Sequence, residues 1–214
     1  MGRIRVWRPE EAGRLVAEVR ALLLAGGIVA LPTETFYALA VYPFERKALS
    51  RLFTLKARSP EKPVLVLVAA PEMLAQVAAA VPPAGGRLMA RFWPGPLTLI
   101  LPARPGLPGW LTGGTGTIGV RQPRQSVTCR LVASLGFPVT GTSANRSGRP
   151  ALLDAQEVAQ EFGPGVDLIL DAGPCPGGLP STIVDVTGAP PRLVRAGAVP
   201  WARLTEVVPE IVHS

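Results

Sequence analysis

Apolar and polar positions follow two periodicities along this chain, one helical and one extended. The first helical stretch places these apolar side chains on one face: Leu15, Val16, Val19, Leu22 and Leu23. Pro9 suits a first helical turn, and Gly26 and Gly27 end the pattern. We therefore predict a helix over residues 9–25.

Helical patterns and short apolar runs alternate through the rest of the chain. Further helices are predicted over residues 44–55, 72–81, 84–92, 125–135, 154–162 and 199–209. Runs of strand length occupy residues 28–31, 64–68, 97–101, 117–120, 137–141, 166–170 and 181–186. Continuous Val, Ile and Leu runs are typical of strands that are buried on both faces. This alternation predicts an α/β fold, with a twisted, open, mixed sheet flanked by helices.

The connections between these elements refine the expected topology. No helical pattern separates 97–101 from 117–120, so these two strands are expected to pair antiparallel. The segments 102–116 and 173–180 are rich in Pro and Gly and are interpreted as loops. No internal repeat or linker interrupts the pattern, so we expect one domain over residues 1–214.

Composition narrows the possible chemistry. Apolar residues make up 48% of the chain and charged residues 17%, which favours a globular protein over a disordered one. Cys129 and Cys175 form no C-x-x-C pair, which argues against a zinc site and suits a reducing compartment. The only histidine is His213, next to the C-terminus. This nearly excludes a Ser-His-Asp catalytic triad and a metal site built from histidines. We expect no protein-bound metal centre.

The charge balance favours anionic partners. The net charge is +7, and 19 of the 22 basic residues are Arg, whose planar fork binds phosphates and carboxylates. A general preference for Arg over Lys explains the excess equally well. The apolar stretch 21–31 is shorter than the roughly 18 residues of a membrane span and follows several glutamates. We therefore expect a soluble, cytoplasmic protein with no membrane association.

Polar and glycine-rich segments lie at the ends of several predicted strands. They include PTET (32–35), GGTGT (113–117), TSANRSG (142–148) and GGLPST (177–182). Ligands of open α/β sheets bind at strand ends, so these loops are expected to meet at one site. The candidate cations are Lys56, Arg58, Lys62, Arg121 and Arg195.

Each of these features alone has a second interpretation. The basic residues over 56–62 also suit a solvated helix end, where they complement the helix dipole. Arg121, directly after a strand, fits either a ligand contact or a salt bridge to a neighbouring carboxylate. Residues 113–117 lack the spacing of a phosphate-binding P-loop. Together, however, cations, hydroxyls and backbone amides suit nucleotidyl transfer, which depends on positioning and charge neutralisation.

Several motifs, in order, resemble those of one known family. They read PTETFYALA, KARSPEKPVLVL, RFWPGPLTLILPA, GTIGVRQP, VTGTSANRSGRP and PSTIVDV. This series resembles the YrdC-like threonylcarbamoyl-AMP synthase family, in its short single-domain form, over about residues 14–197. The resemblance implies a twisted α/β fold with a large, concave, basic cleft, similar to double-stranded-RNA-binding folds.

The resemblance also implies an activity. Members of the family form threonylcarbamoyl-AMP and pyrophosphate from L-threonine, bicarbonate or CO₂, and ATP accompanied by Mg²⁺. The product serves the N6-threonylcarbamoyl modification of adenosine in tRNA (t6A37), which makes tRNA and t6A-machinery proteins possible partners. The alternative is a non-catalytic, YrdC-like paralogue that uses the same basic surface to bind RNA.

The resemblance assigns roles to individual positions. Lys56 and Arg58 match the K-x-R motif of the family and would act in catalysis by holding the ATP phosphates. The implied ATP-binding residues are Lys56, Arg58, Lys62, Thr117, Ser143, Asn145 and Arg195. The implied threonine-binding residues are Thr35, Arg121, Gly141 and Ser181.

Three positions depart from the pattern of the family. Ala38 replaces a glycine, Leu67 replaces a histidine that contacts threonine in some members, and Ala151 replaces a nucleotide-contacting serine. These departures bear on the specificity for threonine and ATP and leave the cationic residues unchanged.

Overall fold

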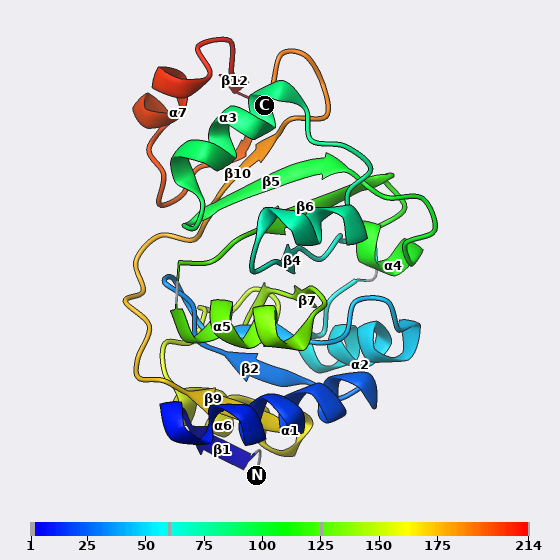
Figure 1. Cartoon of the computed structure of the whole chain (residues 1–214), viewed down its shortest axis with the longest axis vertical. Coiled ribbons are helices and arrows are strands. Elements are labelled where there is room, and N and C mark those ends of the chain that lie inside the picture. The colour runs from blue at the N-terminus through cyan, green and yellow to red at the C-terminus, as the bar shows by residue number, and fades with distance from the viewer. Residues whose placement is uncertain (1–2, 60, 125, 214) are drawn as a thin grey trace.

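The computed structural model describes residues 3–59, 61–124 and 126–213. The chain has an α/β fold, as predicted, but its strands form two mixed sheets instead of one. In Figure 1 one sheet lies in the lower half of the view with the N-terminus, and the other lies in the upper half with the C-terminus. The expected start of helix 125–135 at Gln125, and both ends of the expected domain 1–214, lie outside the described residues.

The lower sheet has five strands. Their order across the sheet is β1 (Arg3–Val6), β9 (Leu168–Asp171), β2 (Val29–Leu31), β3 (Ala38–Ala40) and β8 (Thr142–Ser143). β9 runs parallel to both β1 and β2, whereas β3 is antiparallel to β2 and to β8. The sequence patterns had not indicated β1 or β3. β1 carries alternating arginines, and β3 is only three residues long.

The upper sheet has seven strands. Their order is β12 (Val212–His213), β11 (Arg192–Arg195), β10 (Thr182–Asp185), β5 (Leu97–Pro102), β6 (Thr117–Arg121), β4 (Val66–Leu67) and β7 (Val139–Thr140). β5 and β6 pair antiparallel with Leu99 opposite Val120, which confirms the prediction for this pair.

The chain crosses from the upper to the lower sheet at Gly141. The apolar run 137–141 leads into β7, and β8 begins in the other sheet directly after Gly141. A Cβ atom at Gly141 would lie 2.5 Å from Cγ of Leu67 and 2.9 Å from Cδ1 of Leu65. The absence of a side chain therefore permits this crossing over the neighbouring strand.

The helices cover the sheets in positions close to those predicted. They are α1 (Ala12–Leu24), α2 (Arg46–Lys56), α3 (Pro83–Phe92), α5 (Ser126–Leu135), α6 (Ala155–Phe162) and α7 (Trp201–Val207). Short 3₁₀ helices occupy Pro9–Glu11 and Gly163–Gly165. α1 packs against α5 on the lower sheet, and α3 packs against α7 near the upper end of Figure 1.

Two loop and helix predictions were wrong. Instead of a helix over 72–81, a 3₁₀ helix ends at Gln76 (Pro71–Gln76) because the backbone beyond it pairs with the end of β5. Ala79 N donates to Pro102 O, and Arg104 N donates to Val77 O. The segment 102–116 contains a one-turn helix, α4 (Gly109–Thr112), which was expected to be a loop.

The central strands of the lower sheet are buried on both faces, as their continuous apolar runs predicted. Leu168 and Leu170 of β9 pack with the apolar faces of α1 and α5, whereas Ile169 packs into the core cluster on the other face. This packing holds the lower sheet rigidly beneath the loops that follow its strands. Among the described residues, no helix is long and apolar enough to cross a membrane.

Candidate functional site

A cavity of about 280 Å³ is lined by residues of both sheets. Ala38 of β3 and Ser143 of β8 line it from the lower sheet. Thr98 of β5, Gly119 of β6 and Ile183 of β10 line it from the upper sheet. The polar segments that the sequence placed at strand ends therefore meet between the two sheets.

Most of the predicted site residues line this cavity. They are Thr35, Arg58, Thr117, Arg121, Gly141, Ser143, Ser181 and Arg195. Three predicted residues, Lys56, Lys62 and Asn145, are not among the described lining residues. Lys62 is exposed, and Asn145 lies directly behind Ser143. The structure thus brings together the residues expected to contact threonine and part of the set expected to contact ATP.

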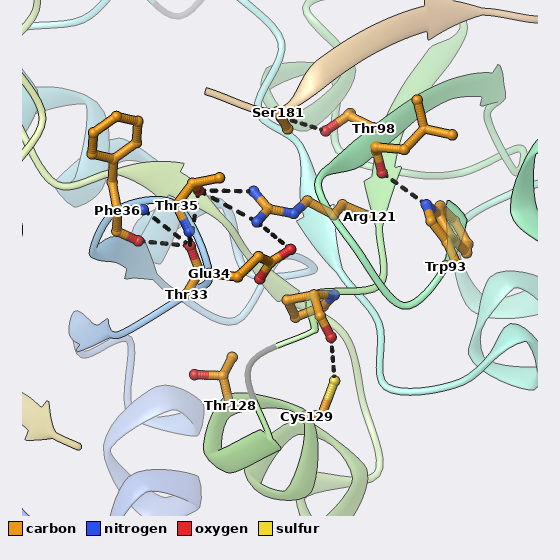
Figure 2. Close-up of polar contacts among 12 residues, drawn as sticks. Thr33, Glu34, Thr35, Phe36, Trp93, Thr98, Arg121, Thr128, Cys129 and Ser181 are labelled. Atoms are coloured by element: carbon orange, nitrogen blue, oxygen red, sulfur yellow. Dashed lines mark hydrogen bonds and ion pairs between the residues drawn. The ribbon is translucent and has the colours of Figure 1, made fainter. Parts of the chain in front are cut away.

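Arg121 ends β6 and is buried between the sheets, with only 5% of its surface exposed. Both terminal nitrogens lie near the Thr35 hydroxyl, at 3.4 Å for Nη1 and 3.3 Å for Nη2. Nη2 also lies 2.7 Å from Oε1 of Glu34, as Figure 2 shows. This contact is a close ion pair without the alignment of a hydrogen bond. The interpretation of Arg121 as the partner of a carboxylate is confirmed, and because Arg121 also lines the cavity, a ligand contact remains a prediction.

Glu34 was not among the residues predicted from the sequence. Its side chain is 15% exposed, and it neutralises the buried charge of Arg121. The available signal was its position inside the PTET segment, directly before Thr35. A carboxylate that follows a buried strand is a natural partner for a buried arginine at another strand end.

Thr33, also missed, organises the turn that carries Thr35. Its hydroxyl oxygen accepts hydrogen bonds from the backbone N–H groups of Thr35 (3.2 Å) and Phe36 (3.3 Å). The hydroxyl also lies 2.7 Å from the carbonyl oxygen of Phe36, to which it donates, and 3.0 Å from the Thr35 hydroxyl (Figure 2). A threonine whose hydroxyl bonds to the backbone two residues later is typical of a tight turn. This turn fixes the direction of the Thr35 side chain.

Ser181 is held from two directions on the upper sheet. Its hydroxyl lies 2.9 Å from the hydroxyl of Thr98, a buried residue of β5 (Figure 2). Arg195 of β11 donates to Ser181 O through Nη2 (2.6 Å) and Nε (3.1 Å), and to its Oγ through Nη2 (3.0 Å). Thr98 was not predicted as a site residue, although a threonine inside the apolar run LTLIL was a visible signal.

The cavity is electrostatically suited to anions. Three guanidinium groups line it, those of Arg58, Arg121 and Arg195, and the described lining residues include no carboxylate. Burial lowers the pKa of Arg58, and burial together with the charge of Arg121 lowers the pKa of Arg195. A bound anion would relieve this desolvation and repulsion. Nε of Arg58 and Nε of Arg121 are buried without a hydrogen-bond partner in the part of the chain that the structure describes.

Lys56 occupies a different environment from these arginines. It is 1% exposed, and its Nζ donates to Ser143 O, to Asn145 O (2.6 Å) and to Asn145 Oδ1 (3.1 Å). Burial lowers its pKa to about 7, with a further contribution from the charge of Arg58. The three oxygen acceptors oppose this effect because they match the three N–H donors of an ammonium group. In this structure, the ammonium group of Lys56 is therefore bonded to the 143–145 segment.

The three departures from the family pattern lie in different places. Ala38 and Ala151 line the cavity. Leu67 is 1% exposed and packs in the core beneath Gly141, so it supports the cavity without being among its described lining residues. Within residues 3–59, 61–124 and 126–213, no three His, Cys, Asp or Glu side chains are grouped so as to hold a metal ion.

The chain resembles curated proteins over nearly its whole length. It is 35% identical over 209 residues to a threonylcarbamoyl-AMP synthase of Pyrococcus abyssi, covering 98% of this chain and 59% of that protein. It is 37% identical over 200 residues to a putative threonylcarbamoyl-AMP synthase of Mycobacterium leprae, covering 94% of this chain and 90% of that protein. The chain therefore spans little more than half of the first relative and most of the second.

Solved structures agree with this similarity. The P. abyssi Sua5 protein in complex with L-threonine superposes with a TM-score of 0.92 at 34% identity, covering 100% of this chain and 62% of that one. The E. coli protein YciO superposes with a TM-score of 0.85 at 25% identity, covering 95% of this chain and 100% of that one. The model of the Sua5/YciO/YrdC family, described as telomere recombination, matches residues 21–197. With its fold, its cavity and these relatives in agreement, the chain belongs to the Sua5/YciO/YrdC family.

Proposed function

We propose that this protein is a threonylcarbamoyl-AMP synthase. It would use L-threonine, bicarbonate or CO₂, and ATP to form threonylcarbamoyl-AMP and pyrophosphate, as a nucleotidyltransferase. The observation that carries the proposal is the cavity between the sheets, where three guanidinium groups and several hydroxyls face one space. Such a site suits a ligand pair with one carboxylate and several phosphate oxygens.

The relatives support the amino-acid half of this proposal. The P. abyssi Sua5 structure contains L-threonine, and its chain superposes on all of this one. Several relatives bear the name threonylcarbamoyl-AMP synthase, among them the proteins from P. abyssi and Bacillus subtilis. Both are longer than this chain, which covers 59% and 56% of them, so the complete activity is proposed on the basis of the site.

The proposed reaction has two steps. The neutral amine of threonine attacks the carbon of CO₂ and loses a proton to solvent, forming a carbamate. A carbamate oxygen then attacks the α-phosphorus of ATP in line, and the bond from that phosphorus to the bridging oxygen of the β-phosphate breaks. Pyrophosphate leaves with the electron pair of the broken bond. Positioning and charge neutralisation supply most of the catalysis of such a transfer.

The proposed roles follow the two sides of the cavity. Arg121 would pair with the threonine carboxylate, with Thr35, Gly141 and Ser181 beside it. On the nucleotide side, Arg58 would contact the phosphates, and the remaining contacts would come from the residues Thr117, Ser143 and Arg195. Fixed arginines and hydroxyls need little rearrangement as negative charge moves toward the leaving group.

Mg²⁺ would enter this site with ATP. The described lining residues include no carboxylate, so the protein itself does not fit a dedicated magnesium cage. The phosphate oxygens of ATP are the natural ligands for the ion. We assign no step of the reaction to it.

The test of the proposed function is pyrophosphate release from ATP. We expect release that requires both L-threonine and bicarbonate, and little release with serine or valine in place of threonine. Release independent of the amino acid, or no release at all, would overturn the proposal. The alternative, an RNA-binding paralogue, predicts no release and an RNA affinity that falls steeply with salt.

The product would serve t6A37 formation in tRNA, which we propose takes place in the cytoplasm. The unstable mixed anhydride would be passed to an enzyme that transfers the threonylcarbamoyl group to adenosine. We also propose tRNA and the proteins of the t6A machinery as binding partners of this protein.

A further inference from the structure

The C-terminus of α2 sends two cationic side chains in different directions. Ala57 follows the helix in a left-handed conformation, with φ of 49° and ψ of 48°. The backbone N–H of Arg58 donates to Phe53 O at 3.0 Å, which completes the helix end. After this turn Arg58 lines the cavity, whereas Lys56, the last residue of α2, is buried and donates to Ser143 and Asn145.

All hydrogen-bonding capacity of the Lys56 ammonium is directed at one loop, residues 143–147. Nζ donates to the backbone oxygens of Ser143 and Asn145 and to the side-chain oxygen of Asn145. The carbonyl oxygen of Lys56 accepts from the backbone N–H of Ser147 at 2.9 Å. The end of α2 and the 143–147 loop are therefore joined by both main-chain and side-chain contacts.

This loop carries Ser143, a lining residue of the cavity. The Ser143 hydroxyl lies 2.7 Å from Oδ1 of Asn145, which also accepts from Lys56. The amide nitrogen of Asn145 donates to Arg149 O at 2.6 Å. The orientation of the Asn145 amide is therefore defined, because its nitrogen faces an acceptor and its oxygen faces donors. Lys56 therefore holds the backbone of Ser143 directly and its hydroxyl through Asn145.

β8 has little other support. It is two residues long, and among the strands that the structure describes it pairs with β3 alone, at the edge of the lower sheet. Ala144 adds two backbone contacts: its N–H donates to Tyr37 O at 2.7 Å, and its carbonyl oxygen accepts from Leu152 N at 3.0 Å.

Without Lys56, two carbonyl oxygens and one amide oxygen near the cavity would lose a charged donor. Ser143 O would keep the N–H of Asn145 at 3.0 Å, and Asn145 Oδ1 would keep the Ser143 hydroxyl. These contacts lie within residues 143–145, so the donors that tie these oxygens to α2 would be lost, at a cost in free energy for each charged hydrogen bond.

We propose that Lys56 is a positioning residue that acts on the reaction by holding the 143–147 loop against α2, and that it does not contact the phosphates of ATP. The inference rests on the proposed function, and it separates the roles of the two cations in the K-A-R segment. Arg58 belongs to the cavity wall, whereas Lys56 shapes the wall from behind.

The decisive experiment compares ATP with AMP, which lacks the two terminal phosphates. Binding of each nucleotide is measured by calorimetry for the wild-type protein, Lys56→Met and the matched variant Arg58→Met. In Lys56→Met, we expect the 143–147 loop to be correctly placed in about one-tenth of the molecules. The affinities for ATP and for AMP should then both fall about tenfold, and the ratio of the two affinities should not change. Arg58→Met should lower the ATP affinity about tenfold more than the AMP affinity, because a charged contact is lost.

Hydrogen exchange of the ligand-free protein provides a second measurement. The amides of Ala144, Asn145 and Ser147 should exchange faster in Lys56→Met and at the wild-type rate in Arg58→Met. Lys56→Gln keeps two N–H donors, so it should fold and show intermediate values if the methionine variant is too unstable.

A lowered ratio of ATP to AMP affinity in Lys56→Met, with normal exchange of the loop amides, would overturn the positioning role. A wild-type protein that binds neither nucleotide would instead overturn the proposed function. In that case the exchange rates still decide whether Lys56 anchors the loop. The two failures are therefore distinguishable.

Discussion

The 33–36 turn and the 143–147 loop each hold a buried cation, but they do so by different means. In the first, Arg121 is paired with the carboxylate of Glu34 and lies near the hydroxyl of Thr35. In the second, Lys56 is surrounded by neutral oxygens. The first arrangement balances the buried charge, whereas the second solvates it without neutralising it. Of these two cations, Arg121 lines the cavity, whereas Lys56 is not among the described lining residues.

The largest effect should follow from removing Arg121. Arg121→Met leaves Glu34 as a buried carboxylate without its counter-ion, and breaking such a pair costs about 3–5 kcal/mol of folding free energy. Urea denaturation measures the loss. The double variant Glu34→Gln with Arg121→Met should recover much of it because no unpaired charge remains. A double variant as unstable as the single one would contradict the ion-pair explanation.

A smaller effect concerns pH and Lys56. Its pKa is about 7 in the folded protein and higher in the unfolded chain, so above pH 7 the unfolded chain binds the proton that the folded protein has lost. Stability therefore gains from rising pH, by about 1 kcal/mol per pH unit. The free energies of unfolding of the wild-type protein and of Lys56→Met are measured by denaturation at each pH. From pH 7 to pH 9, the value for the wild type should rise relative to that for Lys56→Met.

The range ends at pH 9 for a reason. Burial raises the pKa of Cys129 and of Cys175 to about 11, so above pH 9 the folded protein retains protons that the unfolded thiols lose. The two thiols therefore lower the stability of the folded protein as the pH rises further. This effect is the same in the wild-type protein and in Lys56→Met. Parallel stability curves for the two proteins would mean that the oxygens around Lys56 outweigh its burial and keep it charged.

The smallest effect should follow from Thr98→Val, a change of nearly equal volume. It removes the hydroxyl partner of Ser181 while Arg195 still holds the serine. Loss of one neutral hydrogen bond corresponds to about 1 kcal/mol, so the KM for threonine should rise about fivefold. Steady-state kinetics measure this, with the KM for ATP as the internal control. An equal rise in both KM values would assign Thr98 to the general stability of the site.

The fold was predictable where the local pattern of apolar residues indicates which side chains are buried. The apolar run of β9 and the helical faces of α1 and α5 appear where the periodicity indicated them. The helix predicted over 72–81 failed because its backbone groups bond to residues near 102–104, a competition that no local pattern reveals. β3 was missed because its three residues are too few to show a period.

The candidate site was predictable as a set of residue types and not as a set of contacts. Hydroxyls and arginines at strand ends identified Thr35, Arg121 and Ser143, which line one cavity. Glu34 and Thr98 were missed because neither stands out until its partner is known. Lys56 was expected to face a ligand, and its contacts to Ser143 and Asn145 could not be predicted because the partners lie far away along the chain.

The fold class, the buried strands and the types of polar side chain at the site therefore follow from the amino-acid sequence alone. They do so because hydrophobic burial and side-chain chemistry are properties of individual residues and their near neighbours. Only the tertiary structure decided that the strands divide between two sheets and that Arg121 meets Glu34. Likewise, it alone joined Lys56 to Ser143, which lies 87 positions away along the chain. Such pairings depend on how distant segments pack, and the local pattern of a segment does not specify which distant atoms will satisfy its polar groups.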